Sequence, residues 1–139
     1  MTTKVFLDTA YAIALSVESD AHHERAEELA GRLEAGQTRL VTTRAILLEI
    51  GNALSKQRYR KAAIELLDAL EEDPTVEIVP LSEELYQQAR ELFRQRPDKE
   101  WGLVDCVSII VMKERGLTEA LTTDEHFKQA GFRALLRDK

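Results

Sequence analysis

Short apolar runs alternate with longer amphipathic patterns along the chain, and this alternation restricts the fold more than any other feature. Apolar runs of strand length predict strands at residues 4–7, 39–42, 76–79, 117–123 (after a short loop) and, at the end, 132–136. Apolar residues at helical spacing predict helices at residues 22–34, 45–55, 60–71, 82–94, 103–115 and 124–130. Strands separated by helices predict an α/β fold with a central parallel sheet covered by helices on both faces.

The segment at residues 103–115 carries conflicting local signals. Its β-branched residues, such as Val107 and Ile109, favour a strand. Its length, the cations near its end and the following Gly116 favour a helix. We expect a helix that is buried on most of its surface.

The length of 139 residues fits a single domain over residues 1–139. The single cysteine, Cys106, excludes an intrachain disulfide, which suits a reducing cytoplasm. No run of about 18 apolar residues predicts a membrane span. The apolar stretch at residues 5–17 contains Asp8 and is interpreted as a strand followed by a helix rather than a signal peptide.

Four acids stand where acids are out of place. Asp8 and Asp124 directly follow apolar runs, and Glu49 and Asp105 interrupt apolar helical patterns. An acid among apolar neighbours costs free energy unless it is paired or binds a metal ion. In open parallel sheets, ligands bind beyond the carboxyl ends of the strands, where Asp8 and Asp124 are expected to lie.

Each acid also has a simpler explanation. Asp8 and Asp124 suit the N-caps of the helices that follow them. Glu49 is then a boundary residue that reaches solvent, and Asp105 an acid favoured by the helix dipole in a first turn. The four together favour a metal centre, because oxygen ligands suit Mg²⁺ and Mn²⁺, which also relieve the repulsion between carboxylates. One or two such ions support phosphodiester cleavage.

Further residues are candidates for a supporting role. Thr9 and Thr123 stand beside two of the acids and can hold a carboxylate or a metal-bound water. Arg44 is a candidate phosphate contact and Asn52 lies one helical turn beyond Glu49. His126 is a candidate contact to phosphate or metal-bound water. An ordinary surface role remains the alternative for Arg44, Asn52 and His126.

The formal net charge of −6 argues against a nucleic-acid partner, since phosphate contacts require Lys and Arg. Bound cations reverse the sign locally, however, and basic residues cluster at 56–61 and 94–99. A nucleic-acid substrate therefore remains compatible with the composition.

The order of these motifs resembles the PIN-domain nucleases, especially the small ones that act as toxins in toxin–antitoxin pairs. The resemblance rests on Phe6-Leu7-Asp8-Thr9-Ala10, Glu49, Val104-Asp105-Cys106, Leu121-Thr122-Thr123-Asp124 and the ending Asp124-Glu125-His126-Phe127 with Ala130-Gly131-Phe132. It covers essentially the whole chain.

The resemblance implies a three-layer α/β/α sandwich with a parallel sheet and a Mg²⁺- or Mn²⁺-dependent endoribonuclease. It implies that Asp8, Glu49, Asp105 and Asp124 are the catalytic, metal-binding acids. It also implies an RNA substrate, a homodimer and a cognate antitoxin protein. The alternatives are a phosphohydrolase or phosphotransferase with Asp8 as nucleophile, a non-catalytic binding module of the same fold, and a DNA nuclease.

Overall fold

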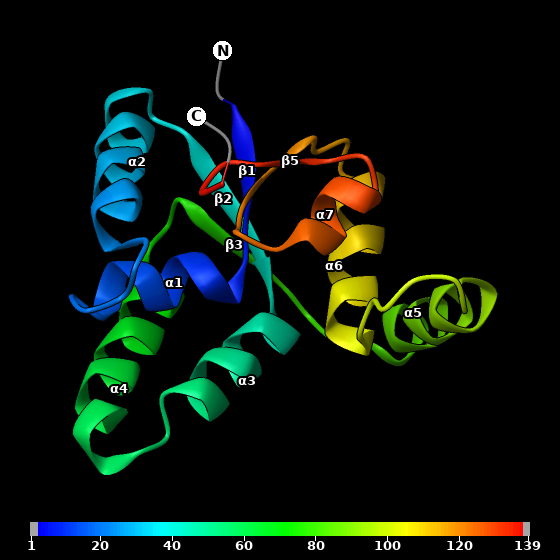
Figure 1. Cartoon of the computed structure of the whole chain (residues 1–139), viewed down its shortest axis with the longest axis horizontal. Coiled ribbons are helices and arrows are strands. Elements are labelled where there is room, and N and C mark those ends of the chain that lie inside the picture. The colour runs from blue at the N-terminus through cyan, green and yellow to red at the C-terminus, as the bar shows by residue number, and fades with distance from the viewer. Residues whose placement is uncertain (1–2, 138–139) are drawn as a thin grey trace.

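The computed structural model describes residues 3–137 and builds them around a five-stranded, all-parallel sheet (Figure 1). The strand order is β3-β2-β1-β4-β5. The strands are β1 (Lys4–Leu7), β2 (Arg39–Thr43), β3 (Val76–Val79), β4 (Glu119–Leu121) and β5 (Arg133–Ala134). The expected parallel sheet is thus confirmed, with short strands at the positions that the apolar runs predict.

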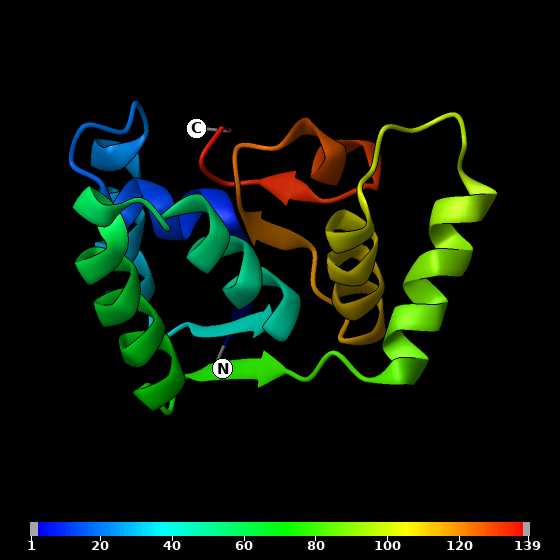
Figure 2. The same cartoon turned by 90° about the horizontal axis from the view of Figure 1, so that it is seen from below.

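Helices follow the strands and cover the sheet. They are α1 (Thr9–Ser16), α2 (His23–Ala35), α3 (Arg44–Ala53), α4 (Gln57–Glu72), α5 (Glu83–Gln95), α6 (Leu103–Glu114) and α7 (Glu125–Gln129). Seen from below, α4 and α6 lie on opposite sides of the sheet, and α5 lies outside α6 (Figure 2). The three-layer α/β/α architecture is therefore confirmed.

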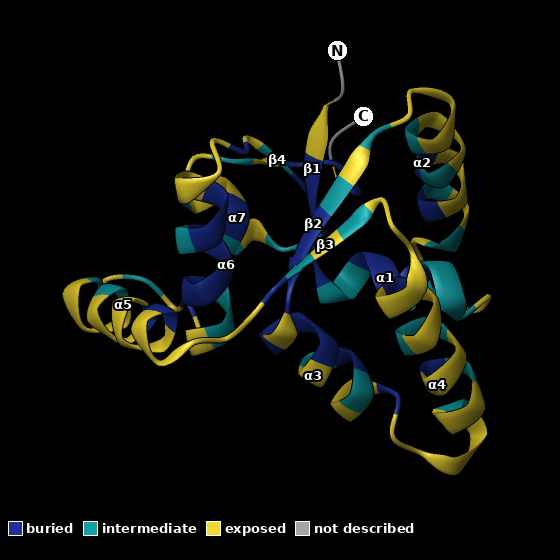
Figure 3. Cartoon of the chain, turned by 180° about the vertical axis from the view of Figure 1, so that it is seen from behind, coloured by how far each residue is buried: buried dark blue, intermediate teal, exposed yellow. Residues whose placement is uncertain are grey.

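The core forms where the central strands meet the helices on either face (Figure 3). Phe6 of β1 is fully buried and packs against Phe127 of α7, with 6.1 Å between the ring centroids. Burial of a large apolar side chain contributes about 1.5–3 kcal/mol, so these rings fix α7 against the centre of the sheet. None of the helices in residues 3–137 combines the length and apolar character needed to cross a bilayer.

The segment whose local signals conflict is helical, as expected. Helix α6 buries Cys106, Val107, Ile109, Val111 and Met112. Helix α6 packs against both β2 and α5. This tertiary packing outweighs the intrinsic preference of its β-branched residues for strands. Because α6 begins with Leu103, Asp105 lies in its first turn.

The strand order determines where ligands can bind. The chain runs outward from β1 to β2 and β3, then returns to β4 on the other side of β1. The reversal lies between β1 and β4, which pair through Phe6–Ala120 and Leu7–Leu121. Such a reversal opens a crevice at the carboxyl ends of the strands. Asp8 follows β1, and Asp124 follows β4 after two threonines.

Candidate metal centre

Asp8 directly follows β1 and is the most deeply buried of the four acids, with 8% of its surface exposed. The backbone N–H of Asp8 donates to the carbonyl of Leu121 at 3.3 Å, which holds the residue against β4. Thr122 Oγ1 donates to Asp8 Oδ2 at 2.7 Å. Asp8 occupies the N-cap position of α1, but within the described chain its side chain makes no capping hydrogen bond. The cap explanation therefore fails for Asp8.

The environment of Asp8 disfavours its ionised form. Burial raises the pKa of Asp8 from 3.8 to about 7, and the negative charges of Glu49 and Asp105 add to this rise. The hydrogen bonds from the Thr122 hydroxyl and the Thr9 backbone oppose it. A carboxyl group that repels its neighbours in this way is suited to binding a cation.

Glu49 reaches the same edge from α3. Thr9 Oγ1, in the first turn of α1, donates to Glu49 Oε1 at 2.6 Å. Thr43 caps α3 by accepting a hydrogen bond from the Ile46 N–H, so the helix starts directly at the end of β2. Glu49 is consequently half-buried and held by a hydroxyl, rather than extended into solvent.

Asp105, Asp124 and His126 form a tight group. One ligand atom from each of these three residues lies within 4.8 Å of the other two. His126 Nδ1 is 3.2 Å from Asp105 Oδ2 and 3.1 Å from Asp124 Oδ1. Burial and the charge of Asp124 raise the pKa of Asp105, whereas the Gly102 N–H and His126 lower it. The candidate His126 thus lies between two acids.

Thr122 connects the two groups of acids. Its hydroxyl donates to Asp8 and accepts a hydrogen bond from the Asp124 N–H at 2.9 Å. Sequence reasoning pointed to Thr123, but the residue that contacts Asp8 is Thr122, which is fully buried. The signal that identifies Thr122 is its position one residue after Leu121, which pairs with the last residue of β1.

Two acids retain the simpler role as well as their place in the cluster. Asp124 caps α7, because its Oδ1 accepts a hydrogen bond from the His126 N–H at 2.9 Å. Asp105 Oδ2 accepts from the Gly102 N–H at 2.9 Å and so closes the first turn of α6. These contacts fix the orientation of both carboxylates. Capping and ligand binding are compatible here, since each carboxylate keeps a second oxygen.

The remaining candidates lie further from the cluster. Arg44 opens α3 and forms an ion pair with Glu71 of α4 at 2.9 Å. Asn52 is exposed near the end of α3, and Thr123 is half-buried beside Thr122. Contact of these three residues with a substrate stays a prediction.

The donor set suits a hard divalent cation. Asp105 and Asp124 supply carboxylate oxygens and His126 supplies an imidazole nitrogen within 4.8 Å of one another. Asp8 adds a third carboxylate, which interacts electrostatically with Asp105 and with the carboxylate of Glu49. Within the described chain, His126 Nδ1 is buried and makes no well-aligned hydrogen bond, although two carboxylates are near it. A cation held between these groups would satisfy the nitrogen and relieve the repulsion among the acids.

Comparisons with known proteins identify the family of the chain. The sequence profile of the PIN domain matches residues 5–133. The chain is 30% identical over 129 residues to the 23S rRNA-specific endonuclease VapC20 of Mycobacterium tuberculosis. The aligned region covers 92% of this chain and 95% of VapC20.

Two solved structures are similar in fold. The crystal structure of M. tuberculosis VapC20, described as a sarcin–ricin loop cleaving toxin, has a TM-score of 0.80 and 28% identity. It covers 92% of this chain and 95% of its own. VapBC2 from Rickettsia felis, bound to a promoter DNA fragment, has a TM-score of 0.63 and 16% identity, covering 95% and 97% of the two chains.

Proposed function

The chain belongs to the PIN-domain family, and on that premise we propose that it is a metal-dependent endoribonuclease. We propose further that it is the toxin of a toxin–antitoxin pair, acting as a single nuclease domain over residues 1–139. One observation carries the activity: Asp8 is buried at the end of β1, where burial and then the charges of Glu49 and Asp105 raise its pKa, and Thr122 joins it to Asp124.

The roles of the residues follow from their positions. Asp8, Glu49, Asp105 and Asp124 would hold one or two Mg²⁺ or Mn²⁺ ions, with Thr9 and Thr122 orienting Glu49 and Asp8. A bound ion of this kind lowers the pKa of a water molecule and neutralises charge that develops on the phosphate. His126, between Asp105 and Asp124, orients both carboxylates or contacts the phosphate.

An RNA substrate is supported by the activity named for one relative of this chain. VapC20 is an endonuclease specific for 23S rRNA and covers nearly the whole of this chain. Ribosomal RNA is therefore the first substrate to test, together with single-stranded and hairpin RNA.

Partners and location are part of the same proposal. The solved structure of VapC20, which has a TM-score of 0.80 to this chain, is described as that of a toxin. This description supports a cognate antitoxin as the partner of this chain. A homodimer and a cytoplasmic location complete the proposal, and the single buried Cys106 suits a reducing compartment.

The test is cleavage of end-labelled RNA by purified protein in Mn²⁺, Mg²⁺ or EDTA, beside Asp8→Asn prepared in the same way. We expect cleavage that requires the metal ion and disappears in the variant. Equal cleavage by both proteins would reveal a contaminating nuclease and leave the proposal without support. Cleavage of DNA with equal efficiency would change the assigned substrate.

Two further measurements separate the alternatives. Trapping of a phosphate ester on Asp8 would identify a phosphohydrolase or phosphotransferase instead. Calorimetry that detects no Mn²⁺ binding, together with no cleavage, would identify a non-catalytic binding module.

A further inference from the structure

The imidazole of His126 lies between two carboxylates but forms an aligned hydrogen bond with neither of them. We propose that Nδ1 of His126 binds the cation directly, and that this one nitrogen makes the centre select a divalent transition metal, such as Mn²⁺ or Co²⁺, over Mg²⁺. This inference rests on the proposed metal-dependent function, because it concerns the same centre. His126 is then a ligand of the ion rather than only a group that orients the acids.

Three side chains converge at this point of the molecule. Among residues 3–137, one group of histidines, cysteines and acids brings a ligand atom from each of three residues within 4.8 Å of the other two. That group consists of Asp105, Asp124 and His126. An ion that binds the two aspartates therefore has an imidazole beside it.

The distances within this group match those between the ligands of a small cation. His126 Nδ1 is 3.2 Å from Asp105 Oδ2 and 3.1 Å from Asp124 Oδ1. Ligand atoms at neighbouring positions of an octahedral ion are about 3 Å apart, because the bonds to the ion are about 2.1 Å long. Nδ1 therefore already has the spacing of a ligand that is next to both oxygens.

The alignment of Nδ1 argues against a simple ion pair with the acids. The atom is buried, and in the described chain it makes no aligned hydrogen bond, although both distances are short enough for one. An imidazolium that served only to pair with an acid would direct its N–H at one oxygen. A buried nitrogen without a partner is unfavourable, and a bound cation would supply the partner.

The start of α7 fixes the ring in this position. The backbone N–H of His126 donates to Asp124 Oδ1 at 2.9 Å. The next residue, Phe127, is fully buried and packs against Phe6 of β1. Because the backbone is held on both sides of the ring, little movement has to be lost when His126 binds an ion.

The rest of the ring suits a histidine that binds a metal through Nδ1. The side chain of His126 is 29% exposed although Nδ1 is buried, so another part of the ring reaches the surface. His126 lines a hollow of about 370 Å³ together with Glu100 and Glu125. A histidine that binds a metal through one nitrogen donates the N–H of the other to a carboxylate or to water. Carboxylates and solvent are thus available to the proton on Nε2.

The chemical type of the ligand determines which ion the centre prefers. Carboxylate oxygens suit Mg²⁺ and Mn²⁺ alike, whereas an imidazole adds affinity for transition metals, and adds more for Co²⁺ than for Mn²⁺. Mg²⁺ also releases its bound water reluctantly. The acids alone would accept either class of ion, so His126 is the residue that shifts the preference toward transition metals.

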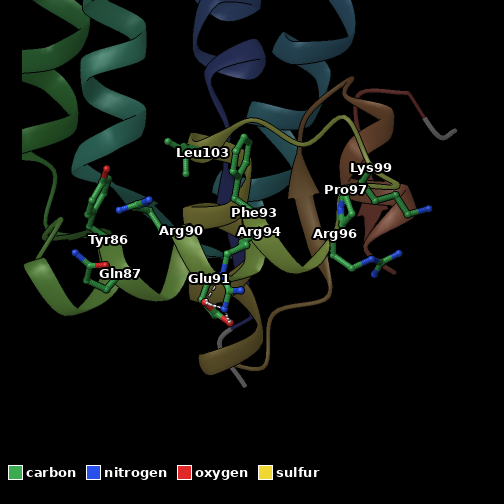
Figure 4. Close-up of a pocket in the computed structure, with 10 residues that line it drawn as sticks. All are labelled: Tyr86, Gln87, Arg90, Glu91, Phe93, Arg94, Arg96, Pro97, Lys99 and Leu103. Atoms are coloured by element: carbon green, nitrogen blue, oxygen red, sulfur yellow. Dashed lines mark hydrogen bonds and ion pairs between the residues drawn. The ribbon is translucent and has the colours of Figure 1, made fainter.

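The groove of about 930 Å³ on the outer face of α5 is a poor competitor for such an ion (Figure 4). Four of its ten lining residues are cationic, and its one acid, Glu91, pairs with Arg94 at 2.6 Å. A divalent cation added to the protein therefore reports on the acids at the ends of the strands rather than on this groove.

The first test detects the metal-bound nitrogen directly. Mn²⁺ is added to the full chain without an affinity tag, and electron spin echo modulation is recorded with natural and with nitrogen-isotope-labelled histidine. We expect coupling from a directly bound nitrogen that changes on labelling and disappears in His126→Asn. His22→Asn is the matched control, because His22 is an exposed histidine just before α2, and it should keep the coupling. Coupling that is absent from the parent, or that persists in His126→Asn, overturns the inference.

The second test measures the metal preference by calorimetry with Mg²⁺, Mn²⁺ and Co²⁺. His126→Asn keeps an amide that can donate to the two aspartates but has no ring nitrogen. Its affinity should fall at least about tenfold for Mn²⁺, further for Co²⁺ and least for Mg²⁺. His126→Asp replaces the nitrogen by oxygen, so it should still bind all three ions but lose most of the preference over Mg²⁺. His22→Asn should change none of the affinities.

The outcomes distinguish this inference from the proposed function. If the parent binds the ions and cuts RNA, but His126→Asn weakens all three ions by the same factor, His126 only orients the acids. The inference then fails and the nuclease stands. If the parent binds none of the three ions and cuts no RNA, the proposed function fails and the inference fails with it.

Discussion

Replacing Asp8 by Asn should stabilise the metal-free protein while removing its proposed activity. The ionised carboxylate is disfavoured by burial and by Glu49 and Asp105, which raise its pKa to about 7. Asparagine has nearly the same shape, carries no charge and can still accept the hydrogen bond from Thr122. The variant therefore removes an unfavourable charge without creating a cavity.

The magnitude follows from the pKa of Asp8. The carboxyl group of Asp8 binds its proton more tightly in the native state than in the unfolded state, where its pKa is 3.8. Ionisation of this group therefore lowers the stability of the fold. The stability contributed by the neutral carboxyl is complete below pH 3.8 and is lost as the pH rises to about 7. Ionisation of Asp8 therefore lowers the free energy of unfolding by about 4 kcal/mol at pH 8 and by about 1.5 kcal/mol at pH 5.

The assay is urea unfolding, followed by circular dichroism, of both proteins at pH 5 and pH 8 in EDTA. We expect the variant to be more stable at both values, with the larger difference at pH 8. A difference that does not change with pH, or a variant that is less stable at pH 8, would refute the electrostatic reasoning about Asp8. Saturating Mn²⁺ supplies a control: it should stabilise the parent by about 2.7 kcal/mol at 100 times Kd and the variant by less.

Three other changes test separate parts of the structure. Thr9→Val removes the hydroxyl that holds Glu49, so the affinity for Mn²⁺ measured by calorimetry should fall at least tenfold, and Thr9→Ser should restore it. Asp105→Asn should abolish metal-dependent RNA cleavage with an unchanged circular dichroism spectrum, and retained cleavage would remove Asp105 from the proposed metal site. Phe127→Ala empties a fully buried position beside Phe6 and should cost about 3–5 kcal/mol in urea unfolding, whereas Phe127→Leu should cost clearly less.

The positions of the strands and helices were predictable from sequence because they depend on local periodicity. Apolar runs such as the one ending at Leu7 specify a strand within a few residues, and turn residues such as Gly116 mark the ends. The four acids were also detectable locally, since Asp8 and Asp124 directly follow apolar runs and the other two interrupt apolar helical patterns. Their chemical type was enough to predict a cation site before any contact between them was known.

The contacts that organise the acids were not predictable in this way. Thr122 rather than Thr123 joins Asp8 to Asp124, and this choice depends on the pairing of β4 with β1 across more than a hundred residues of sequence. The sequence left His126 open between a substrate or water contact and an ordinary surface role, and only the packing of α7 beside α6 places it between Asp105 and Asp124. Such contacts arise from tertiary packing, which local patterns do not encode.

The sequence by itself determined an α/β chain with a parallel sheet and four acids suited to a divalent cation, because hydrophobic period and ligand chemistry are properties of short segments. The tertiary structure alone decided which side chains meet. The order β3-β2-β1-β4-β5 brings Asp8 beside Thr122, and the packing of α5 outside α6 turns Tyr86, Arg90 and Phe93 into one groove. The physical reason is that burial of apolar faces sets the arrangement of strands and helices, and polar side chains then occupy the positions that this arrangement leaves them.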